Sequence, residues 1–191
     1  MAVHVLNSPV SANALAARLA AAVEPPTAVV AMGSPWRGDD AAALRVADRL
    51  RARGLARLFN VETAPESFLV PIGTCGAKSC ILVDALDAGA SPGDVVLLEP
   101  ADLEHTDFTT HGLSPKVFLA ALAELSGMTL LVLGIQPGPL RQGDRVSDAV
   151  RRAADAVAEA LGRVCGPCST GGADESSAAG TPRGGPDAHG P

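Results

Sequence analysis

The chain has 191 residues, 47% of them hydrophobic, a length and composition typical of one globular domain that buries a sizeable core. Its formal net charge is −6 and its lysines and arginines form no cluster, which argues against binding to nucleic acid or to an anionic membrane surface. No apolar stretch approaches the roughly 20 residues that a membrane-spanning helix needs.

Residues 1–26 are predicted to form a helical lead-in to the domain. Their Ala-rich part is interrupted by Asn13 and Arg18, and no basic segment precedes it. A signal peptide would have a basic start and a continuous apolar block, so we interpret this segment as an amphipathic helix. We therefore expect the protein in the cytoplasm.

From residue 27 to residue 164, apolar runs alternate with helical patterns, which is typical of an α/β domain. The predicted strands are 27–32, 56–62, 79–86, 94–100 and 128–135. The predicted helices are 39–54, 114–125 and 147–163, the last with Ser147 as its cap, while residues 63–78 allow at most a brief helix. Strands separated by helices imply crossover connections and a mostly parallel, five-stranded twisted sheet that is covered on both faces.

One connection is too short to be a crossover. Residues 87–93 number fewer than the dozen or more that a crossover between parallel strands takes. We therefore predict that strand 94–100 runs antiparallel to strand 79–86, at an edge of the sheet.

Residues 165–191 are predicted to be a disordered tail, because Gly, Pro, Ser, Ala and Asp dominate them. The segment starts with CGPC, the sequence of a thioredoxin-type redox motif, which needs a strand before it and a helix after it. Here a helical pattern precedes Cys165 and Cys168, so we interpret both as reduced thiols without a catalytic task. A redox site, or a zinc site completed by Cys75 and Cys80, is the alternative.

Three polar side chains are predicted to converge at one end of the sheet. In open α/β sheets, ligands bind beyond the carboxyl ends of the strands. Asp40 follows the first predicted strand, Asp84 lies near the end of the third, and His111 lies in a polar loop before a helix. Two carboxylates and an imidazole suit nickel, zinc, iron or copper better than calcium or magnesium. The sequence therefore indicates Asp40, Asp84 and His111 as candidate metal-contacting and catalytic residues.

Each of these residues also has an ordinary structural interpretation. Acidic residues such as Asp39 and Asp40 at a helix N-terminus accept hydrogen bonds from free backbone N–H groups and suit the helix dipole. Asp84 could cap a neighbouring turn, and a single loop histidine such as His111 is more often a surface residue. Only the joint placement of the three at one end of the sheet favours the functional interpretation.

Four segments, taken in their order and spacing, resemble the hydrogenase maturation proteases. They are AMGSPWRGDD (31–40), LVDALDAGASPGDV (82–95), TTHGLSP (109–115) and LGIQPG (133–138). The resemblance covers roughly residues 27–163 and is closest to the endopeptidases that act on large subunits of hydrogenase-3-type enzymes. The segment TAPES at 63–67 also resembles a loop of that subgroup.

The resemblance implies a three-layer α/β/α sandwich and an endopeptidase. Such an enzyme removes the C-terminal extension from the nickel-loaded precursor of a [NiFe] hydrogenase large subunit during maturation. The metal-contacting residues of the family fall on Asp40, Asp84 and His111. The nickel would be supplied by the precursor, so the free enzyme would hold no metal firmly, and we expect a monomer whose partner is that precursor.

Two departures from the family pattern occur in the first loop. Members usually have Gly-Asn-Pro where this chain has Gly33, Ser34 and Pro35, and a glycine where it has Ala41. Ser34 keeps a short hydrogen-bonding side chain, so we expect the loop conformation to survive. Ala41 favours a helix more than glycine would.

The chain contains no Ser-His-Asp signature, no HExxH helix and no cysteine placed near a histidine as a nucleophile. We hypothesise that Asp40, Asp84 and His111 contact the nickel of the precursor, which positions the scissile peptide while a carboxylate activates water. No catalytic role is assigned to Asp39 or to Glu66. The alternative function is a non-catalytic nickel-binding accessory protein of hydrogenase. A nucleotide-binding domain is disfavoured, because the first loop lacks the Lys-Ser/Thr of a phosphate loop.

Trp36 lies in the same loop as the proposed site. An exposed tryptophan is a typical anchor of a protein interface. The alternative is that Trp36 packs against the first helix of the domain and serves the fold alone.

Overall fold

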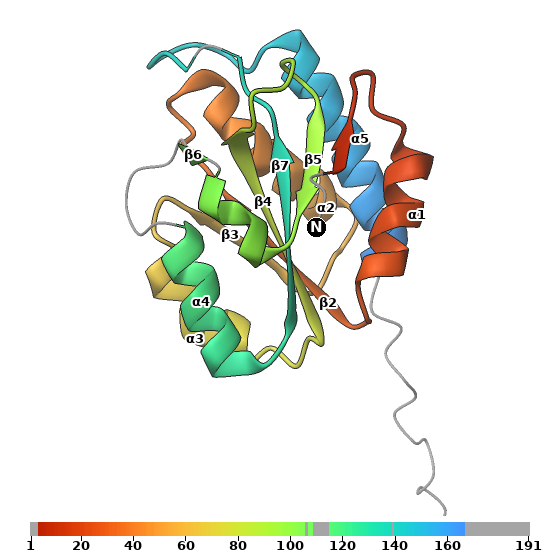
Figure 1. Ribbon diagram of the computed structural model, residues 1–191, viewed down its shortest axis with the longest axis vertical. Helices are drawn as coiled ribbons and strands as arrows, with labels where there is room; N and C mark the ends of the chain where they lie inside the picture. Colours follow the sequence, from red (N-terminus) through yellow and green to blue (C-terminus); the bar gives the residue numbers. More distant parts are fainter. Residues whose placement is uncertain (1–3, 106, 109–114, 139, 167–191) are drawn as a thin grey trace, which may run out of the picture.

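Figure 1 shows a three-layer sandwich in which a twisted sheet lies between two layers of helices, which confirms the predicted architecture. This computed structural model describes residues 4–105, 107–108, 115–138 and 140–166. Within these residues, no helix combines the length and the apolar character needed to cross a membrane.

Seven strands are present among the described residues, two more than the five predicted. They are β1 (His4–Leu6), β2 (Thr27–Met32), β3 (Leu58–Glu62), β4 (Ser79–Asp87), β5 (Val95–Leu98), β6 (Asp107–Phe108) and β7 (Thr129–Ile135). Six are hydrogen-bonded in the order β1-β5-β7-β4-β2-β3, and β6 pairs with β4. The strands β2, β3, β4 and β7 are parallel, as expected for strands joined through helices.

The direction predicted for strand 94–100 is confirmed, but its predicted place at the edge is wrong. β5 runs antiparallel to β7, which is itself parallel to β4. On its other side β5 pairs with β1, which lies in the lead-in that was predicted to be wholly helical. Strands as short as β1 and β6 show too few residues for an alternating pattern, so periodicity does not reveal them. By pairing with β5, β1 satisfies backbone groups that an edge strand would expose.

Five α-helices and three short 3-10 turns connect the strands. They are α1 (Ala12–Ala22), η1 (Gly38–Ala41), α2 (Ala42–Ala52), η2 (Pro65–Phe68), α3 (Leu69–Gly73), η3 (Pro100–His105), α4 (Pro115–Ser126) and α5 (Asp148–Cys165). The helices α1, α2 and α5 cover one face of the sheet, and α3 and α4 cover the other. The segment predicted as a single helix, 39–54, forms the 3-10 turn η1 followed by the helix α2. α5 continues through Cys165, and the rest of the predicted tail, 167–191, lies outside the described residues.

The strand β4 lies at the centre of the core and is buried along nearly its whole length. Alternate side chains point to the two helical layers. Ile81 and Val83 pack with α1, α2 and α5, whereas Leu82 and Leu86 pack with α3 and α4. Asp84 lies between Leu82 and Leu86 in this alternation, so it shares the face covered by α3 and α4.

Candidate active site

Asp84 is a buried carboxylate near the carboxyl end of β4, as the sequence predicts. Its exposed fraction is 0%, and its Oδ1 accepts a hydrogen bond of 2.8 Å from the backbone N–H of Ala85. Its neighbour in β7 is Gly134, where an added Cβ would lie 2.7 Å from the Cβ of Leu86 and from a methyl group of Val96. Burying a carboxylate among apolar side chains costs free energy unless it is bound or coordinated. Asp84 therefore marks this end of β4 as a candidate site.

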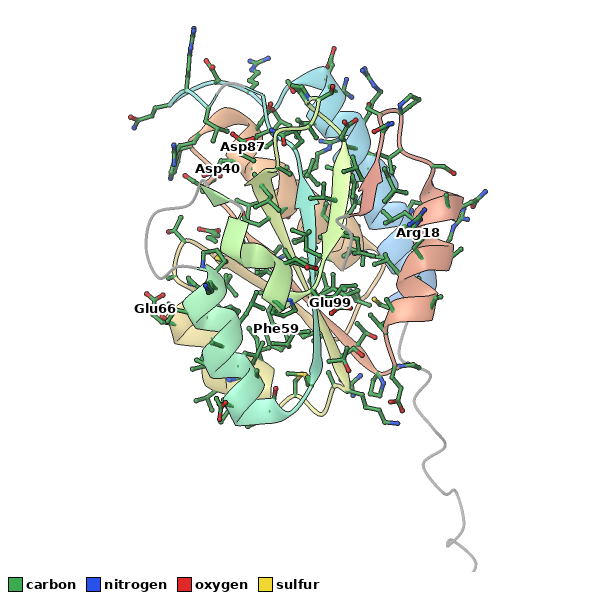
Figure 2. All side chains as sticks on the ribbon, in the orientation of Figure 1. Arg18, Asp40, Phe59, Glu66, Asp87 and Glu99 are labelled. Atoms are coloured by element: carbon green, nitrogen blue, oxygen red, sulfur yellow. The ribbon has the colours of Figure 1, made fainter. Side chains whose placement is uncertain are left out.

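Asp40 lies in η1, and its exposed fraction is also 0%. The turn η1 contacts β4, the strand that carries Asp84. Figure 2 shows Asp40 at the same end of the sheet as Asp87, the last residue of β4. The Nη1 atom of Arg37 lies 3.9 Å from Oδ2 of Asp40, and the Arg37 side chain is 27% exposed. Two buried carboxylates, from η1 and from β4, thus belong to one end of the sheet.

A close approach of the backbone holds η1 against the end of β2. A Cβ added to Gly33 would lie only 2.1 Å from the carbonyl oxygen of Asp40, and Gly33 has a φ of +151°. The N–H of Gly33 donates to the carbonyl of Glu62 at 3.0 Å, which ties the residue after β2 to the end of β3. Ala31 of β2 pairs with Val83, the residue before Asp84 in β4. The close approach of Gly33 to Asp40 therefore places Asp40 at the end of β2, next to the end of β4 that carries Asp84.

Ser34 fills the position where the resemblance leads one to expect asparagine. Its Oγ accepts a hydrogen bond of 3.4 Å from the N–H of Trp36. The serine therefore supplies the short acceptor that the loop was predicted to need, and it does so within the loop itself.

Asp39 has a structural role that the sequence analysis did not identify. Its Oδ1 accepts from the N–H of Ser147 at 2.6 Å, and its Oδ2 accepts from the N–H of Gly138 at 2.8 Å and from the Ser147 hydroxyl at 2.9 Å. These bonds tie η1 to the loop after β7 and to the start of α5. Ser147 is the N-cap residue of α5, as predicted, but its hydroxyl makes no capping bond to its own helix and donates to Asp39 instead.

His111 lies outside the described residues, together with the rest of 109–114. The described chain on either side of it ends at Phe108 in β6 and resumes at Pro115 in α4. Phe108 pairs with Leu86, two residues beyond Asp84 in β4. Within the described part of the chain, no three His, Cys, Asp or Glu side chains form a group that could hold a metal ion.

The side chain of Gln136 connects two of the four motifs, the segments 133–138 and 82–95. Its side chain is 5% exposed, and its Oε1 accepts from the N–H groups of Ala88 at 2.8 Å and Ala90 at 3.1 Å. Its Nε2 donates to Oδ1 of Asp87 at 3.1 Å. A hydrogen bond from the N–H of Gly89 and this bond from Gln136 hold the pKa of Asp87 below its usual value. The amide of Gln136 thus shapes the loop after β4, a structural role not identified from the sequence.

Glu66 and the cysteines lie apart from this site. Glu66 is exposed in η2, and Figure 2 shows it well separated from Asp40. Cys75 and Cys80 pack on the face of the sheet covered by α3 and α4, whereas Cys165 packs on the opposite face. A zinc site that combines Cys75 and Cys80 with Cys165 is therefore excluded. Burial, reinforced by Cys75, raises the pKa of Cys80 to about 12, and burial raises that of Cys165 to about 11, which disfavours both thiolates.

Comparison with known proteins identifies the family. The sequence model of the family described as "Hydrogenase maturation protease" matches residues 44–164, a range that includes Asp84 and His111 and begins four residues after Asp40. The hydrogenase 3 maturation protease of Escherichia coli (strain K12) is 30% identical over 112 residues, which are 57% of this chain and 71% of that protein.

Solved structures agree with the sequence match. The [NiFe] hydrogenase maturation protease HycI from Thermococcus kodakarensis KOD1 superimposes with a TM-score of 0.66 at 25% identity, over 73% of this chain and 91% of that one. The endopeptidase HycI from Escherichia coli superimposes with a TM-score of 0.61 at 25% identity, over 70% of this chain and 86% of that one. With the fold, the matched range and these relatives in agreement, the chain belongs to the hydrogenase maturation protease family and is a peptidase.

Proposed function

We propose that this peptidase removes the C-terminal extension from the nickel-loaded precursor of a [NiFe] hydrogenase large subunit. The observation that carries the proposal is the pair of fully buried carboxylates, Asp40 and Asp84, at one end of the sheet. The chain belongs to a family of proteases, and its proposed site is built from buried acids. The pKa values of Cys80 and Cys165 are raised, so neither described thiol offers a thiolate nucleophile. This combination favours hydrolysis by activated water over attack by a side chain.

We include His111 as the third residue of the proposed site. It follows Phe108 by three residues, and an extended chain spans at most about 3.6 Å per residue, so His111 is within roughly 11 Å of Phe108. Phe108 pairs with Leu86, close to Asp84. This short tether supports a role for the imidazole beside the two carboxylates.

In the proposed reaction the nickel ion arrives with the precursor and belongs to the substrate. Two carboxylates and an imidazole are ligands that nickel accepts, and contact with the ion would place the precursor on Asp40, Asp84 and His111. The ion could also polarise the scissile carbonyl as a Lewis acid. Arg37, 3.9 Å from Asp40 and partly exposed, offers a positive charge to that carboxylate before the ion arrives.

The peptide bond is then cleaved by water. One of the two carboxylates accepts a proton from the water molecule while the oxygen of that water attacks the scissile carbonyl carbon. The carbon–nitrogen bond breaks, and the proton passes to the leaving amine. The products are the shortened large subunit with a new terminal carboxylate and the released extension with a new terminal amine.

We also propose that the reaction takes place in the cytoplasm. Cys75, Cys80 and Cys165 are free thiols, and thiols are kept reduced in that compartment.

The direct test is to incubate the purified protein with nickel-loaded and with nickel-free precursor and to measure the mass of the products. We expect loss of the extension from the nickel-loaded precursor only. Equal cleavage of both forms would refute the role of the ion. Binding of nickel by the protein alone, without cleavage of either form, would instead indicate a nickel-binding accessory protein.

A further inference from the structure

Trp36 is the most exposed large apolar side chain among the described residues. Its exposed fraction is 73%, so the alternative that it packs against the first helix of the domain is wrong. A tryptophan in water exposes a large apolar area that a protein partner could bury. Tryptophan is also among the residues most enriched at the energetic centres of interfaces.

The backbone that carries this side chain is held at two points. The N–H of Trp36 donates to Oγ of Ser34 at 3.4 Å, and its carbonyl accepts from the N–H of Gly143 at 2.9 Å. A side chain presented from a fixed backbone loses less conformational freedom when a partner binds it. The exposure of Trp36 is therefore a property of an ordered turn.

The segment 141–145 packs against the turn that carries the proposed site. A Cβ added to Gly38 would lie 3.2 Å from the Cβ of Asp144 and 3.7 Å from the carbonyl oxygens of Arg141 and Arg145. Gly38 is two residues from Asp40. A partner that presents a peptide bond to Asp40 would therefore have Trp36 and the segment 141–145 beside it.

Two arginines give this segment a local positive charge in a chain whose formal net charge is −6. Arg141 and Arg145 are exposed, and neither forms an ion pair or a side-chain hydrogen bond within the described residues. Asp144 lies between them, so the segment carries two positive charges and one negative charge. Exposed guanidinium groups suit carboxylates, which they can bind through two parallel hydrogen bonds.

We propose that Trp36, Arg141 and Arg145 form a docking surface for the large-subunit precursor. The indole packs on an apolar side chain of the precursor, and the two guanidinium groups pair with carboxylates close to its scissile bond. This inference rests on the proposed function and adds a recognition chemistry to it. Binding of the precursor then depends on the precursor's side chains around the nickel ion as well as on the ion itself.

The test is to measure KM and kcat for cleavage of the nickel-loaded precursor by Trp36→Ala and by the double variant Arg141→Glu/Arg145→Glu. We expect KM to rise about 10- to 30-fold in each with kcat nearly unchanged, as expected for the loss of an interface anchor. The wild-type KM should also rise between about 0.05 and 0.5 M salt, and the double variant should show a much weaker salt dependence.

Matched controls lie on other surfaces of the molecule. Leu125→Ala removes another exposed apolar side chain, 46% exposed in α4. Arg18→Glu reverses an arginine of α1, which Figure 2 shows on the opposite side of the molecule from Asp40. Both controls should keep the wild-type KM and its salt dependence, and all variants should melt near the wild-type temperature.

The two proposals fail in distinguishable ways. If the wild type cleaves the precursor and the Trp36 and arginine variants keep its KM, the docking surface is refuted and the proposed function stands. If the wild type does not cleave the precursor, both are refuted. A wild-type dimer in solution that Trp36→Ala dissociates would show that this surface binds a second copy of the chain instead.

Discussion

The carboxylate of Asp39 accepts hydrogen bonds from both the backbone N–H and the hydroxyl of Ser147, a residue 108 positions later in the chain. Asp40, the next residue, lies in the same turn and contributes the buried carboxylate of the proposed site. Two consecutive acids therefore have different tasks. Asp39 attaches the turn to the start of α5, and this attachment determines where Asp40 can lie.

Asp39→Ala should lower the stability of the fold. The substitution removes the acceptor of three hydrogen bonds, which the backbone N–H of Gly138 and the N–H and hydroxyl of Ser147 donate. We therefore expect a loss of about 2–4 kcal/mol in the free energy of unfolding. Urea unfolding followed by circular dichroism measures this change. Asp48→Ala, which alters an exposed helix residue, should stay within about 0.5 kcal/mol of the wild type. A similar loss in both variants would contradict the role given to Asp39.

Asp40→Asn, Asp84→Asn and His111→Ala should each abolish cleavage of the nickel-loaded precursor. The two asparagine substitutions keep the shape of the side chain and remove its charge, so we expect at most a modest change in stability. If the acids serve only as caps, each change would cost about 0.5–2 kcal/mol and cleavage would fall only in proportion to unfolding. Thermal melts measured beside the cleavage assay separate these outcomes. Folded variants that process the precursor at the wild-type rate would refute the site.

Gly33→Ala should displace η1 and reduce cleavage. The new Cβ would lie 2.1 Å from the carbonyl oxygen of Asp40, a distance that real Cβ atoms do not adopt, so the turn must move. Gly54→Ala is a matched control, because Gly54 also has a positive φ, +73°, but has no atom within 4 Å of the added Cβ. We expect the control to lose about 1 kcal/mol of stability and to keep its activity. Cleavage and unfolding measured on both variants test whether the close approach at Gly33 matters.

The stability of the fold should decrease in alkaline solution. Burial raises the pKa of Cys165 from 9.0 to about 11, so above pH 9 the unfolded chain loses this proton while the folded chain keeps it. The unfolded state then binds fewer protons than the folded state, and the free energy of unfolding falls as the pH rises from 9 towards 11. The chain has no tyrosine to titrate in the same range. Burial raises the pKa of Cys80 as well, to about 12, so Cys165→Ala should make the decrease in melting temperature over this window less steep without removing it. An unchanged slope would contradict the assignment.

Much of the fold follows from local pattern. The apolar runs that became β2, β4 and β7 were predicted nearly to their observed limits, because a strand buried on both faces must be apolar along its length. The shortness of 87–93 likewise predicted the direction of β5, because the length of a connection limits the geometry that it can span. Asp84 could be singled out by the same logic, as a charged residue inside such a run.

The tertiary structure alone decided which distant segments meet. Whether β5 forms an edge depended on β1, which lies about 90 residues earlier in the chain and is too short to leave a pattern. The donors that bind Asp39 come from positions 138 and 147, and the exposure of Trp36 depends on how its turn is held by Gly143. Local hydrophobicity records how deeply a segment is buried, whereas the partner of a polar group is set by the packing of segments that are remote in sequence. For this reason the sequence could indicate Asp40 and Asp84 as acids of the site, whereas only the folded chain shows that Asp39 attaches the turn to α5.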